Sequence, residues 1–320
     1  MKTKNSAKIP VITIFAPTAS GKTALTGELF SSAGSHFVLN GEIVSADSMQ
    51  VYKYMDIGTA KPDEEFCKKI PHHLINMTEP DKQFTVADFI REANKACLEI
   101  FNKGKVPVVC GGTGFYIRNF LYGMPETPQS NEIIRNQLKE RLLRDGNAAL
   151  YAELQTIDPQ SAQKIHQNDS YRIIRSLEVF YTTGKKRSEY EVLNQLRDNY
   201  DFLFIVLQPS REVLYERIRK RVDLMFEQGL ENEFHHLIDM GYTKESPGMK
   251  AIGYSEFFET ENIDEIREKI KHDSCKYAKK QYTYIRDIEG SKIIDFSASD
   301  EDLEKVAEVC RSFLKNHFEF

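Results

Sequence analysis

The sequence predicts an α/β fold: a parallel sheet of the doubly wound kind, flanked by helices and interrupted by an all-helical domain. Short apolar runs rich in β-branched residues alternate with amphipathic helical segments, which is typical of parallel sheets. A loop containing glycine joins the first run to the first helix. Between residues 125 and 200 no comparable buried run occurs, so this stretch predicts a helical insertion.

The strands and their helices follow one another in a repeated order of strand, loop and helix. Strand-like runs lie at residues 11–15, 42–48, 106–110, 201–210 and 291–297. Helical patterns begin after the first, third and fourth of these, and residues 86–104 form an amphipathic pattern that ends at Gly104. The insertion contains five helix-like segments, at residues 131–146, 147–158, 161–169, 171–185 and 188–199. We therefore expect a core of residues 1–124 and 201–320 around a helical domain of residues 125–200.

Composition limits the class of protein. A chain of 320 residues with 41% hydrophobic and 28% charged residues is typical of a soluble globular protein of about two domains. The N-terminal sequence lacks the apolar core of a signal peptide, and the five cysteines form no C-x-x-C pair, so we expect a cytoplasmic protein with reduced thiols. The net charge is −5, so any nucleic acid must be bound by local basic patches.

The loop after the first strand carries a phosphate-binding pattern. Gly21, Lys22 and Thr23 match the end of G-x-x-x-x-G-K-[ST], while Ala16 occupies the first glycine position. Backbone N–H groups at the start of a helix bind anions, Lys22 adds a charge, and the Thr23 hydroxyl can ligate magnesium. The predicted P-loop comprises Ala16, Pro17, Thr18, Ala19, Ser20, Gly21, Lys22 and Thr23. An alanine at Ala16 costs about 1 to 2 kcal/mol if φ is positive there, and little otherwise.

The acidic residue that helps to hold magnesium in P-loop kinases is missing from its usual place. The run at residues 106–110 continues into "GGTG" without an acid, whereas Asp47 follows the second strand-like run. A carboxylate at that position can face the loop across the crevice at the strand ends. We expect Lys22, Asp47 and Thr113 to line one crevice.

Eight ordered motifs resemble one family over nearly the whole chain. They are "APTASGKT", "SADSMQVYKYMDIGTAKP", "PHHLIN", "VVCGGTGFYIRNFLYG", "YRIIRSLEVFYTTGK", "RIRKRVDLMFEQGL", "KAIGYSEF" and "YAKKQYTYIRD". Together they are similar to the bacterial tRNA dimethylallyltransferases. The resemblance implies that the loop holds the diphosphate of dimethylallyl diphosphate rather than the phosphates of ATP.

The same resemblance implies a chemistry for these residues. An adenine amino group must displace diphosphate from an allylic carbon, so the leaving group needs stabilisation and the amine must lose a proton. By resemblance, Lys22, Arg221 and Thr23 with magnesium stabilise the diphosphate, Asp47 is the general base, and Thr113 orients the centre. The target is adenosine 37, beside the anticodon in the tRNA stem-loop.

The family positions that contact tRNA also map onto this sequence. The implied set comprises Asp47, Ser48, Met49, Gln50, Thr113, Arg135, Tyr171, Arg172, Ile173, Ile174, Arg175, Lys250, Ala251, Ile252, Gly253, Tyr254, Ser255, Lys279, Lys280, Gln281, Tyr282, Thr283, Tyr284, Ile285 and Arg286. The last segment is basic with interleaved aromatic residues, which suits phosphate contact and base stacking. Taken as a helix, the same segment would turn Tyr282 and Ile285 towards the core.

Other interpretations remain open from the residues alone. Without the family, Thr113 is a helix N-cap and Arg221 belongs to a solvated charged face. His72 and His73 lack a nearby acid or cysteine and are expected to be hydrogen-bonded structural residues rather than metal ligands. A P-loop kinase, an enzyme that prenylates free adenine nucleotides, and a nucleotide-gated RNA-binding module are alternative functions. No sustained heptad is visible, which favours a monomer.

Overall fold

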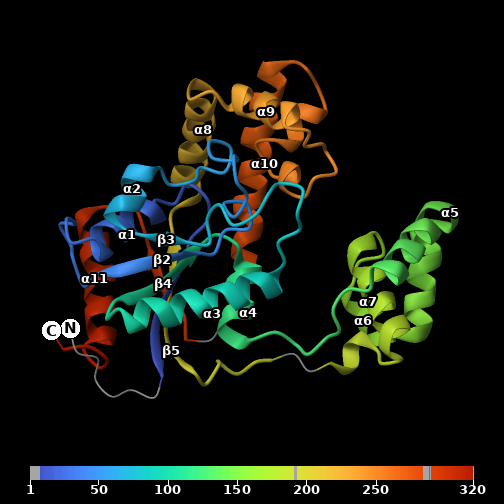
Figure 1. Ribbon diagram of the computed structural model, residues 1–320, viewed down its shortest axis with the longest axis horizontal. Coiled ribbons are helices and arrows are strands. Elements are labelled where there is room, and N and C mark those ends of the chain that lie inside the picture. Colours follow the sequence, from blue (N-terminus) through green and yellow to red (C-terminus); the bar gives the residue numbers. More distant parts are fainter. Residues whose placement is uncertain (1–7, 191–192, 284–287, 289, 320) are drawn as a thin grey trace. The chain divides into compact units, whose positions relative to one another are not determined.

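Six parallel strands form a single sheet in this computed structural model, which describes residues 8–190, 193–283, 288 and 290–319. The strand order is β3-β2-β4-β1-β5-β6 (Figure 1). The strands are β1 (Ile9–Phe15), β2 (Gly41–Ser45), β3 (His72–His73), β4 (Val106–Gly111), β5 (Tyr200–Gln208) and β6 (Lys292–Asp295). This arrangement, with helices against the sheet, confirms the predicted fold class.

Two compact units divide the chain. The sheet unit comprises Met1–Leu121 and Arg197–Phe320, and the helical unit comprises Tyr122–Leu196. The helices of the sheet unit are α1 (Lys22–Phe30), α2 (Glu64–Lys69), α3 (Val86–Asn102), α4 (Gly114–Tyr122), α8 (Arg211–Glu227), α9 (Leu230–Asp239), α10 (Ile263–Thr283) and α11 (Asp300–Leu314), with 3-10 turns η2 (Gly248–Lys250) and η3 (Ser255–Phe258). Among the described residues, none of the helices is both long and apolar enough to cross a bilayer.

The sheet is buried on both faces, which explains why its strands read as continuous apolar runs. Ile12 and Ile14 of β1 belong to a buried cluster with Leu25 and Leu29 of α1 and Val306 of α11. Figure 1 shows α1 and α11 next to one another beside the sheet. Helix α3 packs against the sheet through β1, β2 and β4, and begins with a capping box between Thr85 and Asp88.

The short strand β3 is absent from the sequence prediction because two residues carry no periodic signal. His72 and His73 pair in parallel with β2, and both histidines make hydrogen bonds. His72 Nδ1 lies 2.8 Å from the carbonyl oxygen of Ile70, and His73 Nε2 lies 2.7 Å from the carboxylate of Glu42. Among the described residues no cluster of His, Cys, Asp and Glu is arranged to hold a metal ion.

The helical unit contains α5 (Glu132–Ile157), α6 (Pro159–Lys164), α7 (Ser170–Thr183) and the 3-10 turn η1 (Arg187–Glu189). Gly146 interrupts α5 with φ 79° and ψ 167°, which is where two separate helices were predicted. Leu138, Leu150, Leu154 and Leu177 form the buried core of this unit.

The helix predicted at residues 188–199 is wrong. Of the described residues in that stretch, 188–190 and 193–199, only those of η1 are helical. Arg197 explains part of the difference, since its N–H donates to the carbonyl of Leu121 at 3.0 Å and its guanidinium to the carbonyl of Phe120 at 3.2 Å. The same guanidinium lies over the rings of Phe120 and Tyr200. These contacts hold Arg197 at the turn that leads into β5.

Candidate active site

The loop between β1 and α1 has the geometry of an anion site. Gly21 is the N-cap of α1 with φ 93°, and no side chain caps the helix. The N–H groups of the first turn therefore have no side-chain acceptor on the cap residue and can face an anion. Ser20 Oγ is buried and has no hydrogen-bond partner among the described residues. An acceptor-rich ligand would satisfy these donors.

The alanine in the first glycine position is not strained. Ala16 is fully buried in the core, and its N–H donates to the carbonyl of Gly111 at 3.2 Å. Its φ is not positive, whereas Ala19 in the same loop has φ 60°. The alanine at this position therefore causes little loss of stability, as expected for a residue whose φ is not positive. The left-handed penalty of the loop falls instead on Ala19.

Two cations converge on the loop. Burial lowers the pKa of Lys22, an effect that the charge of Arg221 reinforces and Asp47 opposes. Burial lowers the pKa of Arg221 to about 10, again opposed by Asp47. The Arg221 guanidinium donates to the Thr18 hydroxyl, and its Nε has no partner among the described residues. Arg221 carries charge at neutral pH, and its Nε has capacity for a further acceptor.

Sequence reasoning missed a second arginine on α8. Arg217 donates to the carbonyl of Ser20 at 3.4 Å and to the carbonyl of Ser297 at 2.7 Å. Arg217 and Arg221 are spaced i, i+4 and therefore lie on one face of the helix. That spacing within "RIRKR" was the available signal. Helix α8 thus faces the P-loop with two guanidinium groups.

The carboxylate of Asp47 lies at the same edge of the sheet. Strands β1, β4 and β2 are neighbours, and their carboxyl ends lead into the P-loop, the "GGTG" turn and Asp47 respectively. Asp47 Oδ1 accepts the N–H groups of Met49 at 2.9 Å and Gln50 at 3.4 Å. The charge of Asp47 opposes the lowering of the pKa values of Lys22 and Arg221 by burial.

Thr113 joins the turn after β4 to the segment after β2. Its N–H donates to the carbonyl of Ala46 at 3.1 Å, and its Oγ1 accepts the N–H of Ser48 at 3.0 Å. A side chain at Gly111 would place a Cβ 2.2 Å from the carbonyl oxygen of Ala46, so only glycine permits this approach. Thr113 therefore bonds to the Asp47 segment through its side chain.

Comparison with known proteins identifies the family. The profile described as "IPP transferase" matches residues 50–288. The chain belongs to the IPP transferase family. Curated relatives include the tRNA dimethylallyltransferases of Geobacter sulfurreducens, 39% identical with 96% of this chain and 98% of the relative covered, and of Acetivibrio thermocellus, 42% identical with 95% and 97% covered.

Solved structures agree with this assignment. The tRNA isopentenylpyrophosphate transferase of Bacillus halodurans is 33% identical and covers 97% of this chain and 98% of its own, with a TM-score of 0.68. A eukaryotic dimethylallyltransferase, described as acting on tRNA, is 30% identical with a TM-score of 0.80, covering 96% of this chain and 80% of its own. The family resemblance stated from the sequence is confirmed.

Gln281, one of the family positions, connects the two loops of this IPP transferase site. Its Oε1 accepts the N–H of Thr18 at 3.1 Å, and its Nε2 donates to the carbonyl of Gly112 at 2.7 Å. The side chain is only 5% exposed. Both ends of the amide are thus used within the protein.

Several other family positions are buried or partly buried in their own unit. Ile173 and Ile174 belong to the core of the helical unit, and Ala251 and Tyr254 belong to a cluster packed against α8, α9 and α10. Tyr282 is partly buried against Leu214, Ile218 and Ala278, and burial raises its pKa to about 12. Ile173 and Ile174 lie on the buried face of α7, and Tyr282 lies on the partly buried face of α10. Tyr284, Ile285, Arg286 and the side chain of Thr283 lie outside the described residues.

Exposed family positions occur in both units. In the sheet unit Lys250, Lys279 and Lys280 are exposed, and Ile252 and Ser255 are partly so, with Gly253 buried between them. In the helical unit Tyr171 is 71% exposed, and Arg172 pairs with Asp169 at 3.1 Å.

Two arginines of the helical unit share one buried acid. Arg135 and Arg175 lie 3.2 Å and 3.0 Å from the carboxylate of Glu178, which is fully buried. Burial alone would raise the pKa of Glu178, but hydrogen bonds from Ser130, Arg175 and Asn131 outweigh it and lower the pKa. The Arg135 guanidinium also lies 6.0 Å from the centre of the Tyr171 ring.

A cavity of about 800 Å³ lies at the ends of β5 and β6. Its lining includes Arg211 of α8, Lys279 and Tyr282 of α10, and Phe296. Lys22, Asp47 and Thr113 do not line it, so it is separate from the charged group described above.

Proposed function

We propose that the protein transfers a dimethylallyl group from dimethylallyl diphosphate to the exocyclic amine of adenosine 37, beside the anticodon of certain tRNAs, and releases diphosphate. The observation that carries this proposal is the grouping of Lys22 and Arg221 with the carboxylate of Asp47 at one edge of the sheet. Cations suit a diphosphate leaving group, and a carboxylate beside them suits removal of a proton from the attacking amine. The names of the relatives support the same reaction.

The leaving diphosphate is held by the P-loop, Lys22 and Arg221. The first turn of α1 offers backbone N–H groups, and the unpartnered Ser20 Oγ and Arg221 Nε fit an acceptor-rich ligand. The Thr23 hydroxyl, exposed at the start of α1, would ligate magnesium, which supplies further charge for the diphosphate. Negative charge that develops on the leaving oxygens is thereby stabilised.

Asp47 acts as the general base. Two backbone N–H groups fix one of its oxygens, and this orients the other for the amine of adenine. Thr113 holds Ser48, so it positions the segment that carries Asp47.

The tRNA must present a flipped adenine to Asp47. Extruding a base costs a few kcal/mol, least in a single-stranded loop, and contacts to the anticodon stem-loop must compensate. Family positions that are exposed or partly exposed supply candidates in both units, among them Ser48, Met49, Gln50, Arg135, Tyr171, Arg172, Arg175, Lys250, Lys279 and Lys280. We further propose that the protein acts as a cytoplasmic monomer.

A transfer assay tests the proposal. Purified protein with magnesium and labelled dimethylallyl diphosphate is offered unmodified tRNA in one reaction and AMP in another. We expect label in tRNA alone. Label in AMP would instead assign it to the enzymes that prenylate free nucleotides, and label in neither would overturn prenyl transfer altogether.

The variant Asp47→Ala tests whether Asp47 acts in catalysis as the general base or only in substrate binding. We expect kcat to fall by about 10² to 10⁴-fold, the usual range for a general base, with tRNA affinity retained. Glu212→Ala in the first turn of α8 serves as a control, because the hydrogen bonds of the P-loop among the described residues do not involve Glu212. Unchanged turnover in Asp47→Ala would rule out its role as base.

A further inference from the structure

The segment that follows Asp47 contains neither helix nor strand. Residues 48–63 form turns, with one isolated bridge between Tyr52 and Thr78. Backbone polar groups in such a segment must be paired by side chains or water. Four side chains pair several of these groups here, and two of them, Glu233 and Tyr254, come from a distant part of the chain.

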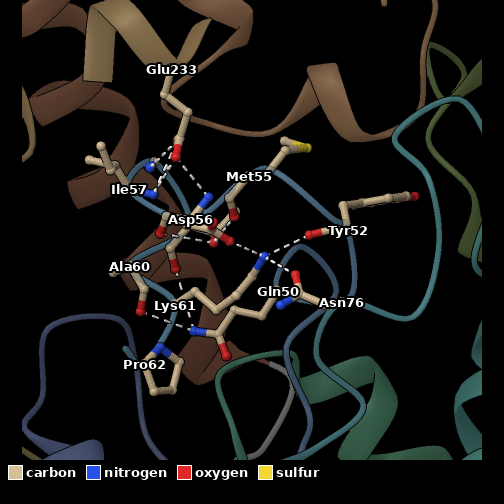
Figure 2. Close-up of polar contacts among 12 residues, drawn as sticks. Gln50, Tyr52, Met55, Asp56, Ile57, Ala60, Lys61, Pro62, Asn76 and Glu233 are labelled. Atoms are coloured by element: carbon tan, nitrogen blue, oxygen red, sulfur yellow. Dashed lines mark hydrogen bonds and ion pairs between the residues drawn. The ribbon is translucent and has the colours of Figure 1, made fainter. Parts of the chain in front are cut away.

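That distant side chain is Glu233 of α9 (Figure 2). Its carboxylate accepts the N–H groups of three successive residues, Asp56 at 3.0 Å, Ile57 at 2.9 Å and Gly58 at 3.1 Å. Tyr254 donates its hydroxyl to the same carboxylate at 2.5 Å. One acid thus fixes a complete turn of backbone.

Tyr254 and Gly58 complete the attachment. Tyr254 is fully buried, and its hydroxyl also accepts the N–H of Gly58 at 3.1 Å. A Cβ at Gly58 would lie 2.5 Å from the Tyr254 ring, so the glycine is required for this contact. Burial, together with the neighbouring Glu233, raises the pKa of Tyr254, which keeps the hydroxyl protonated as a donor.

Gln50 connects this turn to Asp47. Its Nε2 donates to the carbonyls of Ala60 at 3.2 Å and Thr59 at 3.4 Å, while its Oε1 accepts the Ser45 hydroxyl at 3.1 Å. The N–H of Gln50 itself points to Asp47. Residues 59–60 follow directly on the turn that Glu233 holds.

Lys61 ties the same turn from its other side. Its side chain is 3% exposed, and Nζ donates to the Tyr52 carbonyl at 2.7 Å, the Asn76 side chain at 2.6 Å and the Asp56 carboxylate (Figure 2). Burial lowers the pKa of Lys61, and Asp56, Glu233 and Asp47 oppose that shift in decreasing order. Lys61 therefore lies within the electrostatic reach of both Glu233 and Asp47.

We propose that Glu233 is a positioning residue for Asp47. Glu233 holds residues 56–58, and this fixes the positions of the next two carbonyl groups, those of Thr59 and Ala60. The two carbonyl groups accept hydrogen bonds from the Gln50 side chain and so hold Gln50 in place. The backbone N–H groups of Gln50 and Met49 then set the direction of the Asp47 carboxylate. Asp47 is the proposed base, so this inference rests on the proposed function. Glu233 makes no contact with a substrate and acts only through this chain of hydrogen bonds.

The first test compares Glu233→Ala with Glu231→Ala on the same helix. Within the part of the chain that the structure describes, the one ion pair of Glu231 is with His235, at 3.9 Å, so Glu231 serves as the matched control. We expect Glu233→Ala to lower kcat by about 10- to 100-fold, as displacement of a catalytic group by a fraction of an ångström does, with the KM for the prenyl donor changed less than about threefold. The Glu231→Ala protein should match wild type. An unchanged kcat in Glu233→Ala, or an equal loss in both variants, would overturn the proposal.

If Glu233→Ala folds poorly, a second and milder variant still tests the proposal. Tyr254→Phe retains the buried ring and removes only the hydroxyl, and we expect an intermediate loss of kcat. The double variant Glu233→Ala with Gln50→Ala should be no slower than the worse single variant, because both act through the same bonds. Losses that multiply would show independent effects and contradict the relay.

Amide hydrogen exchange gives a readout that needs no activity. In Glu233→Ala we expect faster exchange at residues 56–58 and also at Met49 and Gln50, whereas Glu231→Ala should leave both unchanged. Faster exchange limited to residues 56–58 would refute positioning, even in an active enzyme. If wild type transfers no prenyl group but exchange rises at both places, the proposed reaction fails while the relay stands.

Discussion

At the scale of single residues, two alanines of the P-loop behave differently. The sequence raised the question of strain at Ala16, where a glycine is usual, but that residue is buried with an ordinary φ. Ala19 has φ 60° and carries the left-handed penalty. Sequence pattern could locate the loop but not its dihedral angles, because those depend on how Arg221, Arg217 and Gln281 hold it.

This difference predicts stability changes of opposite sign. Ala19→Gly should raise the free energy of unfolding by about 0.5 to 1 kcal/mol, since relief of the left-handed penalty exceeds the entropic cost of glycine. Ala16→Gly should lower it by about 0.5 to 1 kcal/mol, because it adds entropy without relieving strain. Denaturant unfolding of both variants measures the two values. The same sign in both would contradict the assignment of strain.

Ala16→Gly should also leave the donor site nearly intact. We expect the KM for dimethylallyl diphosphate to change only a few-fold, because the backbone at Ala16 already has an ordinary conformation. Steady-state kinetics at varied donor concentration gives the value. A hundredfold tighter KM would show that the alanine limits diphosphate binding.

At the scale of elements, the long apolar strands were predictable and the short or irregular pieces were not. Strands β1, β4 and β5 are buried on both faces and read as continuous apolar runs. Strand β3 has only two residues and is too short to give a periodic signal. The composition of residues 188–199 favours a helix, but the hydrogen bonds of Arg197 favour a different backbone conformation. Motifs in the sequence indicated Lys22, Thr113 and Arg221 as residues of the Asp47 site. They did not indicate Glu233, because its hydrogen bonds to residues 56–58 join positions that are 175 or more residues apart in the sequence.

Helix α10 offers a test of how elements support the site. Gln281→Ala would leave the Gly112 carbonyl and the Thr18 N–H without their partner, and unpaired buried groups cost about 1 to 3 kcal/mol. We expect that loss of stability together with a raised donor KM, measured by denaturant unfolding and kinetics. Lys276→Ala, at an exposed position of the same helix, is the control. A stable Gln281→Ala protein with normal KM would show that the link is dispensable.

At the scale of the whole molecule, the buried acid Glu42 connects its own strand β2 to the C-terminal end of α3 and to the edge strand β3. Glu42 of β2 lies 2.7 Å from His73, 3.2 Å from Lys103 and 2.7 Å from Lys105. Burial would raise its pKa, but the bonds from Lys105, His73 and Lys103 outweigh burial and lower the pKa from 4.5 to about 2. Both histidines of "PHHLIN" thus have structural hydrogen bonds.

The lowered pKa predicts acid sensitivity. A folded-state pKa below the unfolded value means that the folded protein binds fewer protons, so the stabilisation is complete above pH 4.5 and is lost as pH falls towards 2. The shift corresponds to about 3 kcal/mol. Glu42→Gln should be destabilised by a similar amount near pH 7 and should lose less stability than wild type on acidification, as measured by urea unfolding at several pH values. Glu64→Gln, on the exposed first turn of α2, is the control. Parallel pH curves for wild type and Glu42→Gln would contradict this account.

The position of the helical unit in the chain has a consequence for synthesis on the ribosome. Strand β1, which leads into the P-loop, pairs with β4 on one side and β5 on the other, and the whole of Tyr122–Leu196 is translated between those two partners. The nascent chain therefore exposes an unpaired edge of β1 until translation has passed the insertion. The helical unit has a separate hydrophobic core and can become compact early. Its compaction would shorten the flexible connection between β4 and β5, and so would lower the entropic cost of pairing β5 with β1.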